Sequence, residues 1–308
     1  MSNKDINGLT LAKEYYNAYG TRIFQAAEQL SPGLSDRLTV GLAGEGSQCF
    51  GFDDEISQDH DFAPGFCIWM NDDDFSRWGE DLQAAYKQLP QKFLGFSSQN
   101  LLAPDRLGVM PSSLFYSWFT EIPQTDEDWL LTPEANLAAA TNGQIWKMGC
   151  ADFDQARRKL QGFYPESVLR KKLAARAAVM SQAGQYNMLR MMQRGDKVAA
   201  QLSAARFTEA AISMLHLLHG SYTPFYKWSY RSLQKIAEKS TLAKHCAEEI
   251  SKLMGADVLQ DAFEITESIC SAVAEELRRQ GFSQCESSFL QDHLAEISQG
   301  EDFTYGYY

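Results

Sequence analysis

Two carboxylates stand two residues apart in this 308-residue chain, at Asp59 and Asp61. If the segment is a strand, both side chains point to the same face, roughly 6–7 Å apart along the strand. Such a pair suits Mg²⁺, which takes oxygen ligands and usually keeps phosphate oxygens and waters. Two metal ions about 4 Å apart can also hold the attacking and leaving oxygens of a phosphoryl transfer. The same D-x-D pattern is common on polar surfaces, so the pair alone indicates a metal only weakly.

A glycine turn precedes the two carboxylates. Gly44-Glu45-Gly46-Ser47 directly follows the apolar run 38–43. Two glycines allow the backbone to approach a phosphate closely, and Ser47 adds a hydroxyl donor. An ordinary strand-to-helix turn has the same sequence features. The turn is not a P-loop, because no Gly-Lys-Ser/Thr follows it.

The elements that must position these residues can be read from hydrophobic spacing and from Gly and Pro. Between residues 112 and 150 the chain is rich in aromatics, which favours helices and turns packed against a sheet. The other expected elements are a helix at 8–30, a strand at 38–43, a strand from about Asp59 that is interrupted at Pro64-Gly65, a helix from Asn71 to about Leu89, a short strand at 105–111 and a helix at 152–161.

From Pro165 onward the periodicity is helical, with no strand signal. The shift near 162–165 predicts an α/β (α+β) domain at 1–162 and an all-helical domain at 163–308. The helices expected in the second domain are 166–183, 185–194, 196–219, 228–238, 240–252, 257–280 and 286–298.

The composition is that of a soluble globular protein with a net charge of −12. Residues 1–160 hold 12 Lys and Arg against 23 Asp and Glu, whereas residues 161–308 are nearly balanced, with 16 against 17. This excess of acid argues against a long nucleic acid as partner, although it can also serve solubility alone. Six scattered cysteines indicate reduced, mostly buried thiols. Without a signal peptide or a long apolar run, we expect a cytoplasmic protein with no membrane contact.

Together, the apolar strand, the G-x-G-S turn and the D-x-D pair about a dozen residues later resemble the nucleotidyltransferase superfamily related to DNA polymerase beta, which includes kanamycin- and lincosamide-type enzymes. Gly46 and Ser47 match the family's turn, and Asp59 and Asp61 match its metal-binding pair. The stretch GEGSQCFGFDDEISQDHDFAPGFCIW resembles an uncharacterised bacterial subfamily described as a domain of unknown function. Further stretches similar to that subfamily are Tyr164-Pro165, Gly184-Gln185-Tyr186-Asn187, Arg194-Gly195-Asp196 and Pro224-Phe225-Tyr226-Lys227-Trp228.

The resemblance implies a nucleotidyltransferase core with a small mixed sheet. It implies an enzyme that uses Mg²⁺ or Mn²⁺ to move a nucleoside monophosphate from an NTP, with ATP favoured, to a hydroxyl of a small acceptor, releasing pyrophosphate. The acidic first half suits a cationic acceptor. Two alternatives stay open: a nucleotidyltransferase that adds AMP or UMP to proteins, and a nucleotide-binding module without catalysis. A homodimer also stays open.

Three positions depart from the family pattern. Glu45 places a carboxylate beside the expected triphosphate, which is unfavourable unless a metal or basic side chain offsets it. His60 replaces an apolar residue between the two Asp residues, where a structural role is favoured over a role in the site. Pro64-Gly65 interrupts a strand that is usually continuous.

Many relatives have a third carboxylate, as metal ligand or as base for the attacking hydroxyl. No single residue stands out for this role here. The candidates are Asp105, Glu121, Asp152 and Glu166.

Positive charge for the triphosphate is available in the helical half. Asn187, Arg190, Arg194 and Lys197 follow at spacings of three, four and three, so they line one helix face if the helix continues past Gly195. We expect Arg190, Arg194 and Lys197 to bind phosphate across the domain cleft. A solvated amphipathic face is the alternative.

Overall fold

The structure is a computed structural model that describes residues 6–58, 62–99, 106–255 and 261–303. The chain divides into two compact units. The first consists of Met1–Ile122 and Ala139–Gly162, and the second of Pro123–Ala138 and Phe163–Tyr308. A division thus falls at Gly162/Phe163, close to the composition shift, but the segment 123–138 belongs with the helical residues. Its place is explained by packing and charge, because Trp129 lies against Tyr164 with ring centroids 5.6 Å apart and Glu134 forms an ion pair with Arg176.

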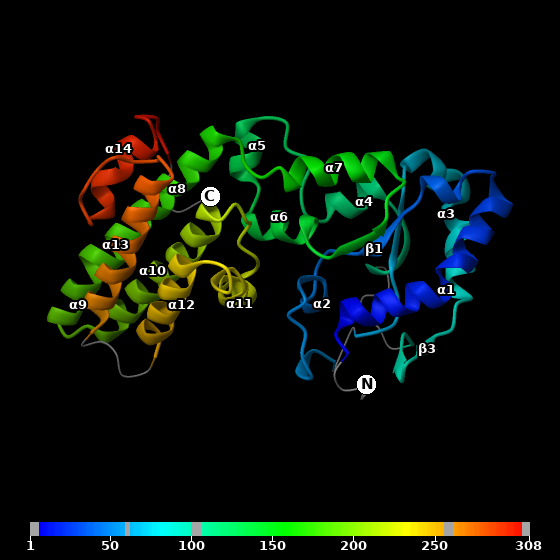
Figure 1. Cartoon of the computed structure of the whole chain (residues 1–308), viewed down its shortest axis with the longest axis horizontal. Helices are drawn as coiled ribbons and strands as arrows, with labels where there is room; N and C mark the ends of the chain where they lie inside the picture. The colour runs from blue at the N-terminus through cyan, green and yellow to red at the C-terminus, as the bar shows by residue number, and fades with distance from the viewer. Residues whose placement is uncertain (1–5, 59–61, 100–105, 256–260, 304–308) are drawn as a thin grey trace. The chain divides into compact units, whose positions relative to one another are not determined.

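A four-stranded mixed sheet forms the centre of the first unit (Figure 1). Its order is β5-β2-β1-β6, with β1 antiparallel to both β2 and β6 and with β2 parallel to β5. Every residue of β1 and β2 is buried, which explains why both read as continuous apolar runs. The small mixed sheet expected from the sequence is therefore present. The strands are β1 (Thr39–Leu42), β2 (Cys67–Met70), β5 (Gly108–Pro111) and β6 (Gln144–Lys147), and a separate hairpin pairs β3 (Lys92–Phe93) with β4 (Phe96–Ser97).

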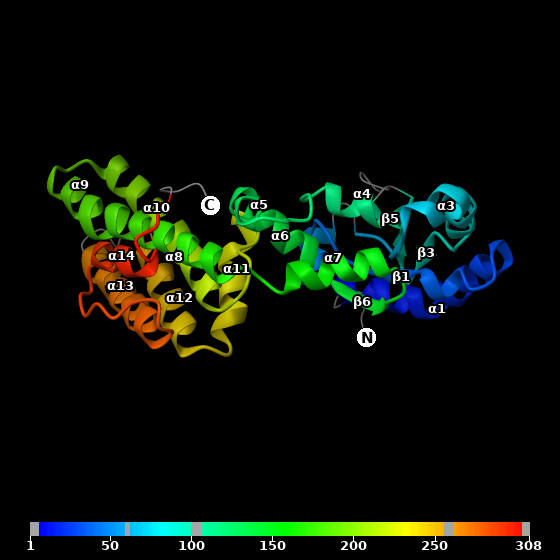
Figure 2. The same cartoon turned by 90° about the horizontal axis from the view of Figure 1, so that it is seen from above.

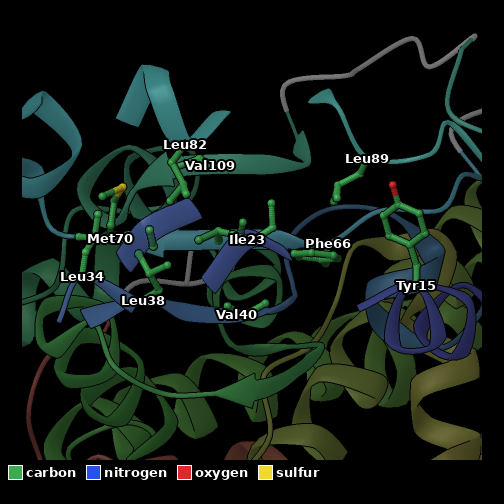
Figure 3. Packing of buried hydrophobic residues seen from close by; sticks show 12 residues of the cluster. Tyr15, Ile23, Leu34, Leu38, Val40, Phe66, Met70, Leu82, Leu89 and Val109 are labelled. Carbon is green, nitrogen blue, oxygen red and sulfur yellow. The ribbon is translucent and has the colours of Figure 1, made fainter. Parts of the chain in front are cut away.

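Helices α1 (Gly8–Leu30) and α3 (Asp72–Lys87) contribute side chains to the core of this unit. Both begin at an Asn cap: the side chains of Asn7 and Asn71 accept hydrogen bonds from backbone N–H groups of the first turn. Figure 3 shows the cluster of buried hydrophobic residues that they form with the sheet. Burying a side chain of this size stabilises the fold by about 1.5–3 kcal/mol. The cluster contains Tyr15, Ile23, Ala27, Leu34, Leu38, Val40, Phe66, Ile68, Met70, Leu82, Leu89 and Val109.

Strand β6 is a correction to the sequence prediction, which placed only helices and turns in 112–150. The strand lies so close to β1 that a Cβ on Gly41 would stand 2.3 Å from the carbonyl oxygen of Gln144. A glycine on β1 is therefore what lets this strand pair with it. The other elements between β5 and the domain boundary are helices: α4 (Ser112–Ser117), α5 (Asp126–Leu131), α6 (Glu134–Thr141) and α7 (Ala151–Gln161).

The described part of the second unit is all-helical, as expected (Figure 2). The prediction of one helix over 286–298 is wrong, because a 3₁₀ turn η6 (Leu290–His293) and a short helix α14 (Leu294–Ile297) occupy its end. The remaining elements are α8 (Glu166–Met180), the π-helix η4 (Ser181–Met188), α9 (Leu189–Gln193), α10 (Lys197–Leu218), α11 (Tyr226–Ala237), α12 (Thr241–Leu253) and α13 (Ala262–Arg279).

Two further expectations concern the whole chain. All six cysteines are free, and five of them are buried, as predicted. Among the described residues, no helix is both long enough and apolar enough to cross a membrane.

Candidate functional site

One end of the mixed sheet carries the glycine turn expected from the sequence. Strand β1 finishes there at Leu42, and the other three strands start there. Gly41 pairs with Cys67, Leu42 pairs with Gln144, and Cys67 pairs with Gly108. The residues that follow β1 and those that precede β2, β5 and β6 are therefore brought to the same place. We call this end of the sheet the turn end.

The glycine turn after β1 has the conformation that its glycines allow. Gly44 has φ +119° and Gly46 has φ +104°, values that residues with side chains rarely adopt. Gly46 caps the four-residue helix α2 (Ser47–Phe50). Within the described part of the chain, the Ser47 hydroxyl has no hydrogen-bond partner and is half-buried. The turn therefore presents a hydroxyl donor together with glycine backbone.

A side chain 98 residues away holds the turn in place. The Asn142 amide accepts a hydrogen bond from the Gly44 N–H at 2.8 Å and donates one to the Gly44 carbonyl at 2.7 Å. Asn142 is itself fixed, because the guanidinium of Arg157 donates to the carbonyls of Thr141 and Asn142. Arg157 is buried, and burial lowers the pKa of its guanidinium. Asn142 and the buried guanidinium of Arg157 thus hold the turn in place, in addition to its local hydrogen bonds.

Arg106 brings a positive charge to the turn through an ion pair with Glu45. Its Nη2 lies 2.5 Å from Oε2 of Glu45, and both side chains are about half exposed. The backbone of Arg106 also belongs to the turn end, since its carbonyl accepts a hydrogen bond from the Cys67 thiol at 3.2 Å. The negative charge of Glu45 is therefore offset by a basic side chain. The sequence predicted that a carboxylate at this position would need such an offset beside a triphosphate.

Asp53 lies next to this group. Its Oδ2 accepts a hydrogen bond from the N–H of Gly8 at 2.6 Å, which ties the start of α1 to the loop. Its Oδ1 is buried and has no hydrogen-bond partner in the described part of the chain. Burial, followed by the neighbouring Cys67, raises the pKa of the Cys49 thiol, and the charges of Arg106, Asp53 and Glu45 also act on it. Asp53 and Glu45 are thus both close enough to α2 for their charges to act on Cys49.

The predicted metal ligands Asp59 and Asp61, with His60 between them, lie outside the described residues. The described part of the strand expected from Asp59 begins only at Cys67, because Phe62 to Phe66 are not in a strand. Chain order still places the pair upstream of β2, and β2 starts at the turn end. Among the described residues, no group of three or more His, Cys, Asp or Glu side chains is arranged to hold a metal ion.

The candidates for a third carboxylate differ in where the structure places them. Asp105 lies outside the described residues, directly before Arg106. Glu121 is exposed and follows Phe119, whose ring would lie 3.5 Å from a Cβ on Gly44. Asp152 is exposed in the first turn of α7, beyond the end of β6 that is opposite the turn end. Glu166 is on α8, where it forms an ion pair with Arg170.

The expected basic face in the second unit does not form as one helix. Gly195 has φ +72°, α9 ends at Gln193, and α10 begins at Lys197 with Asp196 as its cap. Arg190 and Arg194 thus lie before the break and Lys197 after it, all three exposed. The guanidinium of Arg190 lies 4.6 Å from the Tyr186 ring centroid, so part of its charge is already engaged.

A second group of charged residues, which the sequence did not reveal, is buried in the helical unit. Arg176 donates to Glu134 at 2.9 Å and to the Ser213 hydroxyl at 2.7 Å, and Ser213 donates to Glu134. Lys172 is fully buried nearby, with its ammonium 4.8 Å from the Tyr164 ring centroid. Burial lowers the pKa of Lys172 to about 8, while the charge of Glu134 acts in the opposite direction. We call Glu134, Lys172, Arg176 and Ser213 the Glu134 cluster.

Two histidines, His216 and His219, lie at the C-terminal end of α10. His216 is fully buried and is hydrogen-bonded to the Ile212 carbonyl and the Ser232 hydroxyl. His219 bonds the Leu215 carbonyl and the Ser240 hydroxyl. Both ring nitrogens of each histidine are thus engaged in hydrogen bonds within the helical unit.

Comparison with known proteins gives one similarity. Residues 129–229 match a family described as a domain of unknown function (DUF4037). No curated protein and no solved structure matches the chain. The matched segment contains the whole Glu134 cluster as well as Asn142 and Arg157, but it begins after the glycine turn and Arg106.

Proposed function

We propose that this chain is a metal-dependent nucleotidyltransferase that moves a nucleoside monophosphate from an NTP to a hydroxyl of a small acceptor and releases pyrophosphate. The observation that carries the proposal is the turn end of the sheet. A two-glycine turn stands there, held by Asn142, and among the described residues its Ser47 hydroxyl has no hydrogen-bond partner. Asp59 and Asp61 precede β2 in the sequence, and β2 starts at the same end.

The turn supplies the phosphate-binding part. Glycines at Gly44 and Gly46 leave no side chain between the backbone and a ligand. The Ser47 hydroxyl adds a donor. In this proposal, Gly46 and Ser47 bind the β- and γ-phosphates.

Asp59 and Asp61 are the residues proposed to hold the metal. Their carboxylate oxygens are the ligands that Mg²⁺ prefers, and Mn²⁺ accepts the same set. Asp53, whose buried Oδ1 has no hydrogen-bond partner among the described residues, adds a carboxylate in the loop that leads to them. A bound divalent cation would offset the charge of the triphosphate and of the departing pyrophosphate.

The reaction forms one bond and breaks one. The acceptor oxygen bonds to the α-phosphorus, the bond from that phosphorus to the β-phosphate oxygen breaks, and pyrophosphate leaves with the electron pair. The acceptor proton passes to a carboxylate. Among the described candidates we favour Glu121 for this role, because it follows Phe119, whose ring lies beside Gly44, whereas Asp152 lies beyond the opposite end of β6 and Glu166 pairs with Arg170. Asp105 lies outside the described residues and stays a candidate.

The charge distribution supports a small, cationic acceptor and ATP as a metal complex, since residues 1–160 carry almost all of the excess acid. The Glu45–Arg106 ion pair removes one objection to catalysis, because Glu45 no longer stands uncompensated beside the phosphates. We therefore favour an enzyme over a nucleotide-binding module without catalysis.

The test measures pyrophosphate release and covalent adducts. The purified chain is incubated with Mg²⁺ or Mn²⁺, each of the four NTPs and a panel of aminated and hydroxylated small molecules. Pyrophosphate is assayed, and mass spectrometry detects nucleotide adducts on the acceptors or on protein. Asp59→Ala and Asp61→Ala should each lower the rate at least about a hundredfold, because a metal supplies several kcal/mol of charge stabilisation.

Asp73→Ala is the matched control, since Asp73 is an exposed aspartate in the first turn of α3, which follows the opposite end of β2. It should keep the wild-type rate. Equal rates in all three variants would exclude the metal pair. An adduct on protein instead of the small molecules would favour the protein-modifying alternative.

A further inference from the structure

The Glu45–Arg106 ion pair sits where the proposed phosphates would bind. Glu45 lies between the two glycines of the turn, and Arg106 stands two residues before the start of β5. The pair joins segments 61 residues apart, so it is part of the tertiary arrangement of the turn end rather than a local contact.

The bonding of Arg106 is incomplete. A guanidinium has five N–H donors. In the described part of the chain, its side chain makes one hydrogen bond, from Nη2 to Glu45, and 48% of the side chain is exposed. Most of its donors therefore remain available to a ligand that reaches the turn.

Exchange of partners is energetically favourable on general grounds. An ion pair between two half-exposed side chains contributes little to stability, because water already solvates both charges. A phosphate group offers several charged oxygens and a geometry that fits the planar guanidinium at two points. Little is lost when Arg106 leaves Glu45, and more is gained when it meets a triphosphate.

We propose that Arg106 binds the phosphates of the NTP and that Glu45 is its partner only while the site is empty. This inference rests on the proposed function. It adds Arg106 as a phosphate-binding residue and states in which direction Arg106 and Glu45 each change the affinity for the triphosphate. Arg106 favours the triphosphate. Glu45 competes with it, first by holding Arg106 and then by placing a negative charge beside the bound phosphates.

The experiment measures dissociation constants by calorimetry for two probes, a non-hydrolysable ATP analogue with Mg²⁺ and AMP. Arg106→Ala should weaken binding of the ATP analogue about 10- to 100-fold, since hydrogen bonds to charged groups are lost, and should change AMP binding less than threefold. Glu45→Gln should tighten binding of the analogue by about 2- to 10-fold. Arg77→Ala, at an exposed arginine on α3, is the matched control and should change neither constant.

Four outcomes separate the explanations. If the wild-type chain binds the ATP analogue and Arg106→Ala leaves its dissociation constant unchanged, the inference is overturned and the proposed function stands. If Glu45→Gln weakens binding of the ATP analogue as much as Arg106→Ala does, Glu45 positions Arg106 for the ligand. The proposed exchange of Glu45 for phosphate is then wrong. Equal weakening of AMP and the analogue by Arg106→Ala contradicts phosphate binding. Wild-type chain that binds neither probe with Mg²⁺ or Mn²⁺ overturns the proposed function and the inference together. Melting temperatures of all variants confirm that they fold.

Discussion

The turn end of the sheet and the Glu134 cluster are built from the same kinds of side chains, but water reaches only one of them. At the turn end, the side chains of Glu45 and Arg106 are 57% and 48% exposed. In the cluster, those of Glu134 and Arg176 are 7% and 14% exposed, and Lys172 is fully buried. A buried charge must find its partners within the fold, whereas a half-exposed charge can exchange a partner for a ligand. Burial therefore suits the cluster to structure and the turn end to binding.

The largest expected effect comes from removing the carboxylate of the cluster. Glu134→Ala leaves Arg176 and Lys172 buried without it and should lower the free energy of unfolding by about 3–5 kcal/mol. Urea unfolding followed by circular dichroism measures this loss. Glu209→Ala, at an exposed position within α10, is the control and should leave the unfolding midpoint unchanged. If Glu134→Ala is as mild as the control, burial does not distinguish the two regions.

The second effect is a dependence of stability on pH. Burial places the pKa of Lys172 at about 8 in the folded chain, below its ordinary value of 10.5. Between these two values Lys172 binds more protons in the unfolded chain than in the folded chain, so its contribution to stability rises with pH. Burial raises the pKa of thiols such as Cys49 and Cys67, and these groups act in the opposite direction. From pH 8 to pH 9.5 the free energy of unfolding of wild type should therefore gain up to about 2 kcal/mol relative to Lys172→Met, as urea titrations of both chains at both pH values can measure. The same pH dependence in both chains would assign it to other groups.

The third effect concerns the clamp on the turn. Asn142→Ala removes both hydrogen bonds to Gly44 and should lower the free energy of unfolding by about 1–3 kcal/mol. It should also increase hydrogen exchange at residues 43–48 and weaken binding of the ATP analogue, because the turn is no longer held. Asn17→Ala, at an exposed position on α1, should do none of these. A stability loss with unchanged nucleotide binding would limit Asn142 to a structural role.

The sequence predicts what depends on neighbours along the chain. Helix α1, strand β1, the glycine turn and the break at Gly195 all carry local signals: apolar spacing, Asn caps, or glycines at positive φ. Arg106 and Arg157 carry none, and no local signal indicates the hydrogen bonds from Asn142 to Gly44, because these contacts form only after the sheet assembles. Strand β6 was missed among aromatic residues. The Asn142-Gly143 pair before it is a turn signal that favours a strand at Gln144.

The features of the predicted site likewise divide into those that a local sequence signal indicates and those that depend on tertiary contacts. The Glu45–Arg106 pair resolves an objection that the sequence raised, but it joins residues 61 positions apart and no pattern indicates it. The basic face depended on one continuous helix, and the sequence already contained Gly195, which ends it. The metal pair at Asp59 and Asp61 stays a prediction.

The smallest expected effect compares two glycines, one in each unit. Gly46 has φ +104° and Gly195 has φ +72°, and neither has a neighbouring atom close enough to clash with an added Cβ. Alanine should therefore strain both backbones and lower the free energy of unfolding by about 1 kcal/mol at Gly195 and by at least about as much at Gly46, whose φ of +104° and ψ of 149° are essentially limited to glycine. Only Gly46→Ala should weaken binding of the ATP analogue, because the strain at Gly46 moves the amides and the Ser47 hydroxyl, whereas Gly195 lies between two helices. Calorimetry on both variants, with urea midpoints as the measure of the strain in each, gives the comparison. If Gly195→Ala weakens binding as much as Gly46→Ala, the break between α9 and α10 belongs to the nucleotide site, and the functional division between the two regions fails.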